Sequence, residues 1–584
     1  MSNFQNNIEE HTNVLVIGCG GAGLRAAIEV KRNNLSVKVL GKRRKNDAHT
    51  VLAAGGINAS FGNLDTQDSW IQHFADTYLE GYKLGDPSII EIMVKNACTA
   101  VKEIDQWGCD FEKLKNGELN QRYFGAHTYR RTCFKGDYTG HTILNTLLKK
   151  AETLKIPTYD TEYVSDLLIK EDRCYGAMSI NTKTSERTVH LADAVILCTG
   201  GHTKVWKKSS SRNGENTGDG FHLGLKAGCE LIDMEMVQFH PTGMVFPKDM
   251  EGTLVTEAVR GEGGKLFNSN GKRFMVDYDE ERMELSSRDR VAIANYKEII
   301  EGRTSPNGGI FLDISHKSKD FIISKIPKIY NQFLESQNID ISKYPMEVAP
   351  TAHYSMGGIS VNPEDHSTCI NGLYAAGEVS GGLHGANRLG GNSLSEILIF
   401  GKIVGHYACE YSRKISSKFQ PKSQIKLAHE NLDMLIKKGN EETSYIREKL
   451  SNLMWKYCGV MKDEQNLKLG LDKLETLKEV SKNINVQIEE NNPFLLIELL
   501  DLNASIVSAE VTIKSSIIRK ESRGAHNRSD YPNLNNEYEF NILATLKKGK
   551  LVFSKKNLKP LKSELKEAII NTNKIENLSK RLLE

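Results

Sequence analysis

Short apolar runs alternate with helical patterns in the first part of the chain. Residues 14–17 (VLVI) form an apolar run of strand length, and 24–30 carry apolar positions at helical spacing. A second strand-like run follows over 37–40, and 191–201 (LADAVILCTGG) predicts a buried strand that ends in a Thr-Gly-Gly turn. Strand, helix and strand in this order are typical of an α/β fold with a parallel sheet.

Changes in this rhythm set the expected domain boundaries. Loops lengthen and charge rises after about residue 233, whereas beyond Pro421 apolar positions recur at helical spacing. We therefore expect an α/β Rossmann-like nucleotide-binding domain with an inserted α+β capping domain and a C-terminal helical domain. The expected segments are 12–234 and 351–415 (nucleotide-binding), 235–350 (capping), 422–540 (helical) and 541–584 (a basic tail). A late hairpin is predicted over 540–552, with Gly549 at its turn.

The first turn of the chain carries a nucleotide-binding signature. Residues 18–23 (GCGGAG) separate the first strand from its helix, so the GxGxxG pattern stands in the strand-helix-strand context that makes it specific. The pyrophosphate is then expected at the helix N-terminus. In one respect the pattern is not met, because the second strand runs into 41–44 (GKRR) where an acidic residue normally holds the ribose. Ribose recognition must therefore be achieved differently.

A second glycine-rich stretch, 377–396 (GEVSGGLHGANRLGGNSLSE), is the region around which the chain is organised. So much glycine disfavours helix or strand and suits a backbone that approaches a large ligand closely. An apolar helix follows over 393–400, so anions are expected at its start. Arg388 and His384 inside the stretch are candidate binding groups. In the turn over 214–228, Asp219 either caps the next helix or holds a ligand hydroxyl.

Composition narrows the classes of function. A chain of 584 residues with net charge +3 allows several domains and does not indicate a nucleic-acid binder. Residues 541–584 hold eleven Lys or Arg against four Glu, which favours a solvated, weakly packed end over an acidic partner or a membrane surface. Ten cysteines without a CxxC pair signal no metal or iron–sulfur site, and buried free thiols in a reducing compartment are expected. No signal peptide or membrane-spanning run is recognised, so membrane association would need a partner.

Taken together, the motifs resemble the flavoprotein subunit of succinate dehydrogenase/fumarate reductase, within the wider group that includes L-aspartate oxidase. The resemblance covers 14–532. The motifs that carry it are 18–23, 49–57 (HTVLAAGGI), 124–125 (FG), 139–141 (TGH), 217–220 (TGDG), 238–242 (QFHPT), 256–264 (TEAVRGEGG), 287–289 (SRD), 350–358 (PTAHYSMGG), 377–396 and 521–526 (ESRGAH). The resemblance makes the nucleotide-binding domain an FAD-binding domain.

The resemblance also implies a reaction and its partners. The expected activity is oxidation of succinate to fumarate, or the reverse, by hydride transfer to N5 of FAD. Electrons would pass to a separate iron–sulfur subunit, then on to quinone, since this chain has no iron–sulfur cysteine pattern. Membrane attachment would come through an anchor in the complex, which places the chain peripherally on the cytoplasmic side of the inner or plasma membrane.

Site residues follow from the matched motifs. Arg288 matches the proton-transfer arginine of the family, and Glu257 with Arg260 matches its relay. Arginine normally stays protonated, so Arg288 acts as a base only if neighbours pass the proton onward. The residues implied in substrate binding are His240, Thr256, His353 and Arg388, with Phe124 closing over the substrate. The implied FAD contacts are Gly18, Gly20, Gly23, His49, Thr50, Gly55, Gly56, Asp219, Glu378, Ser393 and Leu394.

His49 is the residue that distinguishes the membrane-linked enzymes from L-aspartate oxidase. In the membrane-linked enzymes the matching histidine bonds covalently to the 8α carbon of the flavin, whereas L-aspartate oxidase lacks it. The resemblance therefore implies covalent FAD, although Asp47-Ala48 stands where many relatives have Arg-Ser. L-aspartate oxidase or a soluble fumarate reductase is the alternative. A non-catalytic or RNA-modifying FAD protein is a further alternative that only the basic tail supports.

Overall fold

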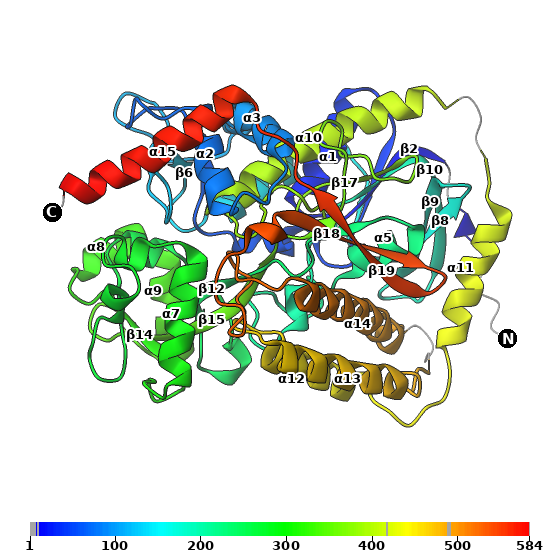
Figure 1. The fold of residues 1–584 in the computed structure, drawn as a ribbon. Coiled ribbons are helices and arrows are strands. Elements are labelled where there is room, and N and C mark those ends of the chain that lie inside the picture. Colours follow the sequence, from blue (N-terminus) through cyan, green and yellow to red (C-terminus); the bar gives the residue numbers. More distant parts are fainter. Residues whose placement is uncertain (1–6, 9–10, 416–418, 488–491, 583–584) are drawn as a thin grey trace.

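The computed structural model describes residues 7–8, 11–415, 419–487 and 492–582 (Figure 1). Its central element is a mixed sheet of order β7-β3-β2-β10-β9-β8, in which β2, β3, β7 and β10 run parallel. β1 and β17 also pair with β10, in parallel. The strands are β1 (Asn7–Ile8), β2 (Thr12–Ile17), β3 (Val37–Leu40), β7 (Thr158–Tyr159), β8 (Glu162–Lys170), β9 (Arg173–Asn181), β10 (Arg187–Leu197) and β17 (Leu373–Ala375). The apolar run 14–17 forms the buried C-terminal part of β2, as predicted.

Helices from distant parts of the chain complete this nucleotide-binding domain. α1 packs against α10, although more than 350 residues separate them. The helices here are α1 (Gly21–Arg32), α2 (Trp70–Glu80), α3 (Pro87–Gln106), α4 (Thr139–Thr153), α5 (Asp219–Ala227) and α10 (Asn392–Arg413). A small sheet of order β4-β6-β5 lies nearby, formed by β4 (Ile57–Asn58), β5 (Gln121–Arg122) and β6 (Thr132–Cys133). Because α10 follows the glycine-rich stretch 377–391, its N-terminus brings that stretch to α1.

The capping domain is the α+β insertion that the sequence predicted, drawn in green in Figure 1. An antiparallel sheet of order β12-β15-β14-β13 packs with helices around its own apolar core. Its strands are β12 (Val237–Met244), β13 (Lys265–Phe267), β14 (Ile310–Asp313) and β15 (Met346–Ser355). Its helices are α6 (Ala258–Gly261), α7 (Arg288–Ile300), α8 (Lys319–Lys325) and α9 (Pro327–Gln337).

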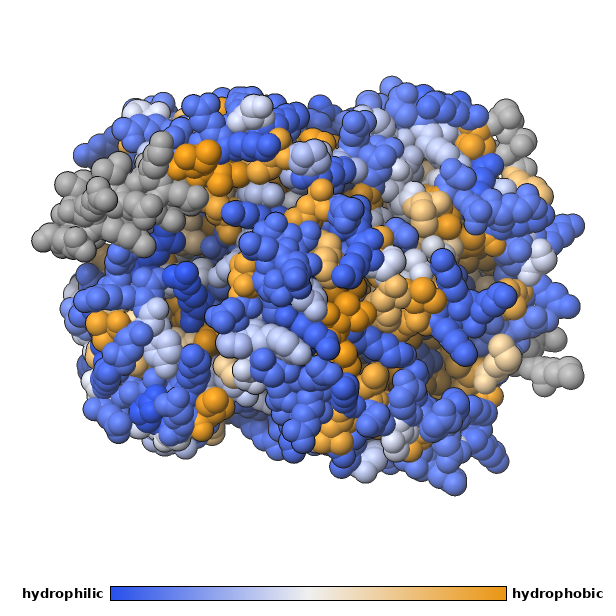
Figure 2. All heavy atoms as spheres, viewed as in Figure 1, coloured by the Kyte–Doolittle hydropathy of each residue, from blue (hydrophilic) through white to orange (hydrophobic). Residues whose placement is uncertain are grey.

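The predicted helical domain is confirmed. It consists of α11 (Lys422–Leu435), α12 (Thr443–Tyr457), α13 (Glu464–Ser481) and α14 (Phe494–Ile518). Short 3₁₀ helices elsewhere are η1 (Lys45–Asp47), η2 (His49–Leu52), η3 (Thr203–Val205), η4 (Lys248–Met250), η5 (Phe274–Asp277), η6 (Met283–Leu285) and η7 (Asn536–Tyr538). Among the described residues, no helix is long and apolar enough to cross a membrane. The face drawn in Figure 2 is mostly hydrophilic, with apolar residues in small groups.

The expectation of a weakly packed C-terminal tail is wrong. The predicted hairpin forms from β18 (Phe540–Lys547) and β19 (Lys550–Asn557), and β18 also pairs with β11 (Leu231–Ile232) in the sheet β16-β11-β18-β19, where β16 is Gly358–Ile359. Ile542 and Ala544 are each 1% exposed, and α15 (Ser563–Leu582) buries Leu565. The apolar positions of β18 thus pack inward, while Lys550 and Lys555 of β19 are exposed.

A substitution at Gly23 tests how closely α1 packs on the sheet. A Cβ at this position would stand 1.9 Å from the Gly18 carbonyl oxygen, a rigid backbone atom. We expect Gly23→Ala to lower the free energy of unfolding by at least about 1–3 kcal/mol, the scale for overpacking, as measured by chemical denaturation. Gly261→Ala is the matched control, because its nearest neighbour would lie 4.0 Å away. Equal stabilities of the two variants would contradict the packing role.

Candidate active site

One cavity collects nearly all the predicted site residues. It lies where the N-terminus of α1, η2, the capping sheet and the start of α10 meet, and every predicted site residue except Gly23, Arg260 and His384 lines it. Gly23 instead provides the close contact between α1 and the sheet, and Arg260 lies buried behind Glu257. The cavity therefore has a nucleotide end near α1 and a polar end near the capping domain.

The nucleotide end begins at the turn between β2 and α1. Gly18 has φ +121°, and a Cβ there would stand 2.1 Å from the Cys198 carbonyl oxygen, so only glycine fits. A Cβ at Gly20 would meet no atom nearer than Thr50 Oγ1 at 3.5 Å, which leaves room for a ligand against the backbone. Thr50 Oγ1 accepts a hydrogen bond of 3.1 Å from the Gly21 amide. A helix N-terminus with a bare glycine backbone fits the pyrophosphate of FAD.

Lys42 follows the end of β3, where the sequence lacks the expected acidic residue, and it pairs with two carboxylates from other elements. Its Nζ lies 2.8 Å from Asp501 Oδ1 and 3.3 Å from Asp219 Oδ2. Asp219 is the first residue of α5, and Gly218 occupies the cap position, so Asp219 does not cap the helix with its side chain. A carboxylate therefore does stand beside the end of β3 and on the cavity wall, but it comes from α5 and is held there by a lysine.

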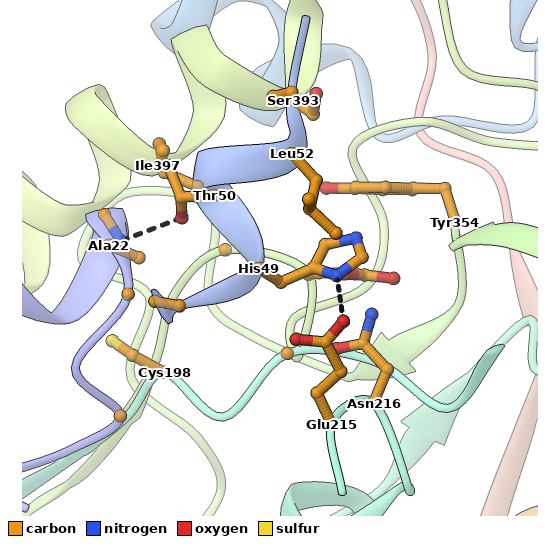
Figure 3. A pocket seen from close by; sticks show the side chains of 18 of the residues that line it. Ala22, His49, Thr50, Leu52, Cys198, Glu215, Asn216, Tyr354, Ser393 and Ile397 are labelled. Atoms are coloured by element: carbon orange, nitrogen blue, oxygen red, sulfur yellow. Dashed lines mark hydrogen bonds and ion pairs between the residues drawn. The ribbon is translucent and has the colours of Figure 1, made fainter. Parts of the chain in front are cut away.

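His49 lies in η2 with its ring facing the cavity (Figure 3). Its Nδ1 is 3.1 Å from Glu215 Oε1. Burial lowers the pKa of His49, but the Glu215 carboxylate outweighs burial, so the net pKa is raised. Glu378, on the same wall, accepts a hydrogen bond of 3.0 Å from the Ser355 amide, and burial raises the pKa of its carboxyl to about 7.

Two arginines meet at the polar end of the cavity. Arg388 Nη2 and Arg288 Nη1 each donate a 3.1 Å hydrogen bond to the same atom, Gln238 Oε1. The Arg388 guanidinium also lies 4.4 Å from the centre of the Tyr354 ring, and its buried Nε has no hydrogen-bond partner among the described residues. Burial and the charge of Arg288 lower the pKa of Arg388 to about 10. This buried, unmatched cation suits a bound anion.

Arg288 also forms a close ion pair. Its Nε and Nη2 lie 2.7 and 2.6 Å from Glu257 Oε2. Arg260 Nη2 is 3.9 Å from the other carboxylate oxygen, which also accepts a 2.9 Å hydrogen bond from the Gly125 amide. Burial raises the pKa of Glu257, but Arg288 and Arg260 outweigh it and hold the pKa at about 2. Glu257 is therefore ionised between two arginines. The three residues that the sequence predicted as a relay, Arg288, Glu257 and Arg260, lie next to one another.

The remaining predicted substrate residues surround this pair. The rings of His240 and His353 are 5.1 Å apart, and burial holds both pKa values well below the usual range, so both imidazoles are neutral. Thr256 precedes α6 on the same wall. A Cβ at Gly55 would stand 2.2 Å from the ring of Phe124, so this glycine makes room for the aromatic ring.

The structure also corrects and extends the predicted set. His384 does not line the cavity, because its Nε2 lies 3.1 Å from Glu396 in a buried pair, so its interpretation as a binding group is wrong. Gln238, which bridges the arginines, was missed as a site residue although it belongs to the QFHPT motif. Lys42 and Glu215 were missed too, and Glu215 carried no recognisable signal.

The fold and the cavity define an FAD-dependent oxidoreductase with a capping domain. Residues 13–394 match the model of the FAD binding domain, and residues 447–574 match that of the fumarate reductase flavoprotein C-terminal domain. The chain belongs to the succinate dehydrogenase/fumarate reductase flavoprotein family.

Relatives and solved structures support this assignment along the whole chain. The chain is 40% identical to one of the subunits of the fumarate reductase (CoM/CoB) of Methanothermobacter marburgensis, over 91% of this chain and 97% of that protein. It is 35% identical to the succinate dehydrogenase flavoprotein subunit of Rickettsia conorii, over 92% and 93% respectively. FrdA of E. coli quinol fumarate reductase superposes with a TM-score of 0.91 at 31% identity, covering 95% of this chain and 98% of that one.

Proposed function

We propose that this chain is the flavoprotein subunit of an enzyme that interconverts succinate and fumarate by hydride transfer to N5 of FAD. The observation that carries the proposal is the pair Arg288 and Arg388, bridged by Gln238 at the polar end of the FAD cavity. Glu257 on the same wall pairs with Arg288, so the Arg388 guanidinium is the cation left without a carboxylate partner among the described residues at this end. A carboxylate of a C4 dicarboxylate would supply that partner.

In this proposal each residue has a distinct role. Arg388 binds one carboxylate through its guanidinium fork, and His240, Thr256 and His353 donate to the other. Phe124 closes over the bound substrate and excludes water. Bound FAD supplies the hydride acceptor or donor at N5. The proposed contacts to FAD are Gly18, Gly20, His49, Thr50, Gly55, Gly56, Asp219, Glu378, Ser393 and Leu394, all on the cavity wall.

Proton transfer falls to Arg288. An arginine can donate a proton toward a developing carbanion, but it takes one from carbon only if a partner removes a proton from it first. Glu257 lies 2.6 Å from Arg288 Nη2 and is ionised, so it can accept that proton. Arg260 holds the carboxylate from behind. These contacts support a relay from Arg288 through Glu257.

Electron partners are proposed from the family. This chain passes electrons to an iron–sulfur subunit, then to quinone, with a membrane anchor in the complex and the chain lying peripherally on the cytoplasmic side. Quinol fumarate reductases among the structural relatives support this arrangement. The names of the relatives differ in the electron partner, since one is a CoM/CoB fumarate reductase. Electron transfer from dye-reduced enzyme to a menaquinone analogue in the purified complex tests the quinone step.

Covalent flavin is the finer proposal for the cofactor. His49 lines the cavity on the FAD side, so we expect denatured protein on a gel to keep yellow flavin fluorescence. His49→Ala should lose that fluorescence completely while FAD remains in the native protein, because the glycine backbone and Thr50 are unchanged. Release of all FAD from the wild type by acid would contradict the covalent bond.

A single assay tests the proposed activity. Purified protein is supplied with succinate or L-aspartate and a dye acceptor, and dye reduction is followed. We expect reduction with succinate and inhibition by malonate. Turnover of aspartate without turnover of succinate would instead identify an L-aspartate oxidase, and no turnover of either with bound FAD would favour a non-catalytic flavoprotein.

A further inference from the structure

Two features of the chain have no role in the proposed reaction, and the fold brings them together. One is Asp47, two residues before His49, and the other is Glu215, which precedes the turn into α5. Arg212 lies between them and contacts both. Asp47, Arg212, Glu215 and His49 therefore form a continuous chain of alternating charge, which we call the His49 cluster.

Arg212 holds Glu215 in one orientation. Its backbone amide and Nε lie 2.6 and 3.2 Å from Glu215 Oε1, and its Nη2 lies 3.0 Å from Oε2. On its far side, Nη1 contacts the Asp47 carboxylate and Nη2 donates a 2.8 Å hydrogen bond to the Asp47 carbonyl oxygen. The Glu215 residue is only 5% exposed. These hydrogen bonds to both carboxylate oxygens fix the Glu215 side chain in the orientation that contacts His49.

Glu215 decides which ring nitrogen of His49 carries a proton. Burial raises the pKa of Glu215, but His49 and Arg212 outweigh burial and hold the pKa well below its usual range, so the group is a carboxylate. An ionised carboxylate only accepts hydrogen bonds. The Nδ1 of His49, 3.1 Å away, must therefore carry a hydrogen. In the neutral ring this leaves the lone pair on Nε2.

The geometry leaves Nε2 available to a ligand. Figure 3 shows the second ring nitrogen of His49 pointing away from Glu215. Within the part of the chain that the structure describes, this nitrogen has no hydrogen-bond partner, and the side chain is 26% exposed on the cavity wall. The ring thus presents an unengaged nitrogen to the space that FAD occupies.

We propose that Glu215, braced by Arg212 and Asp47, is a positioning residue that prepares His49 Nε2 to bond with the 8α carbon of the flavin. This inference rests on the covalent attachment proposed above. It also gives Asp47 a role: the acid orients Arg212, which orients Glu215.

The attachment step balances with FAD and the substrate proposed above. A bond forms between Nε2 and the 8α carbon, and one C–H bond at that carbon breaks. The electron pair of the C–H bond and two protons, one from the carbon and one from the imidazole, end on the flavin ring as a two-electron reduction. The ring would return to the oxidised state by reducing fumarate to succinate, which is the proposed reaction. During bond formation the imidazole becomes positive, and Glu215 stabilises that charge and can take up the Nδ1 proton.

The test follows attachment over time in a riboflavin-auxotrophic host. Full-length protein is expressed without flavin, riboflavin is added, and samples are denatured in acid and read by in-gel fluorescence and intact mass. Glu215→Gln keeps the shape of the side chain and removes its charge. We expect attachment about 10–100-fold slower, by analogy with the loss of a group that orients a metal-binding histidine. Glu215→Asp keeps the charge and should attach flavin faster than Glu215→Gln. Non-covalent FAD in the native proteins reports that the cavity is intact.

Each outcome decides the inference. Glu215→Gln at the wild-type rate, or as fast as Glu215→Asp when both are slow, would overturn it, because charge would then be irrelevant. If Glu215→Gln does not fold, Asp47→Asn decides: slower attachment supports the cluster and an unchanged rate overturns it. The matched control is Glu251→Gln, a carboxylate that pairs with Lys208 away from His49, and equal slowing there would also overturn the inference. Absence of covalent flavin from the wild-type protein would instead overturn the proposed attachment itself.

Discussion

Replacement of Arg288 by alanine should reduce turnover of succinate by about 10²–10⁴-fold or more, the contribution of general acid–base catalysis. The substitution removes the proposed proton donor and leaves Glu257 buried without its nearest cation. FAD should remain bound, because Arg288 lies at the polar end of the cavity, away from the glycine turn before α1. The measurement is the rate of dye reduction by succinate, together with the FAD content of the same sample.

Two further variants make the Arg288 result specific. Arg290 lies on the same helix, α7, and pairs with Asp279 at 3.5 Å on the surface. Arg290→Ala should therefore leave turnover near the wild-type rate. Arg288→Lys keeps a positive charge but cannot make the forked contact with Glu257 and Gln238, so it should recover only a small part of the activity. Near-normal turnover in Arg288→Ala would remove this residue from the mechanism.

Loss of Arg388 should weaken dicarboxylate binding rather than proton transfer. Arg388→Ala is expected to raise the inhibition constant of malonate by about 30-fold to several thousand-fold, which corresponds to the roughly 2–5 kcal/mol lost when one partner of a buried charge pair is removed. The physical reason is that Arg388 is buried and donates only to neutral groups, Ser393 and Gln238, so no carboxylate among the described residues balances its charge. Malonate inhibition in the dye assay gives the constant directly.

The matched control for Arg388 is Arg413→Ala. Arg413 is the last residue of α10, where it pairs with Glu410 at 2.6 Å on the surface. Arg413→Ala should leave the inhibition constant of malonate unchanged. An Arg388→Ala enzyme with wild-type inhibition by malonate would show that the carboxylates bind elsewhere in the cavity, and the charge argument for a dicarboxylate would then fail.

Much of the fold was predictable because its signals are local. The apolar run of β2, the glycines at 18–23 and the helical spacing of α1 lie within about twenty residues, so the periodicity alone indicates the strand-turn-helix unit. The insertion and the late helices were likewise visible as changes of period and composition. The motifs that resemble the family placed nearly every predicted site residue on one cavity. The roles of those residues remain proposals.

The failures have a common physical cause. The tail was expected to be weakly packed because its charge is high, but β18 pairs with β11, more than 300 residues earlier in the chain. His384 was expected to bind ligand because it lies in a glycine-rich stretch, but Glu396 on the following helix takes its ring nitrogen. Charge and residue type describe a side chain, whereas its partner depends on which distant segments the fold brings together.

The sequence by itself determined the class of protein, the order of its domains and the residue types available for the chemistry, because local period and motif spacing are enough for these. Only the tertiary structure decided which charges meet. It placed Gln238 between Arg288 and Arg388, Lys42 beside Asp219, and Glu215 against His49. Each of these contacts joins residues at least 50 positions apart. Ion pairs and hydrogen bonds act over a few ångströms in space regardless of separation along the chain.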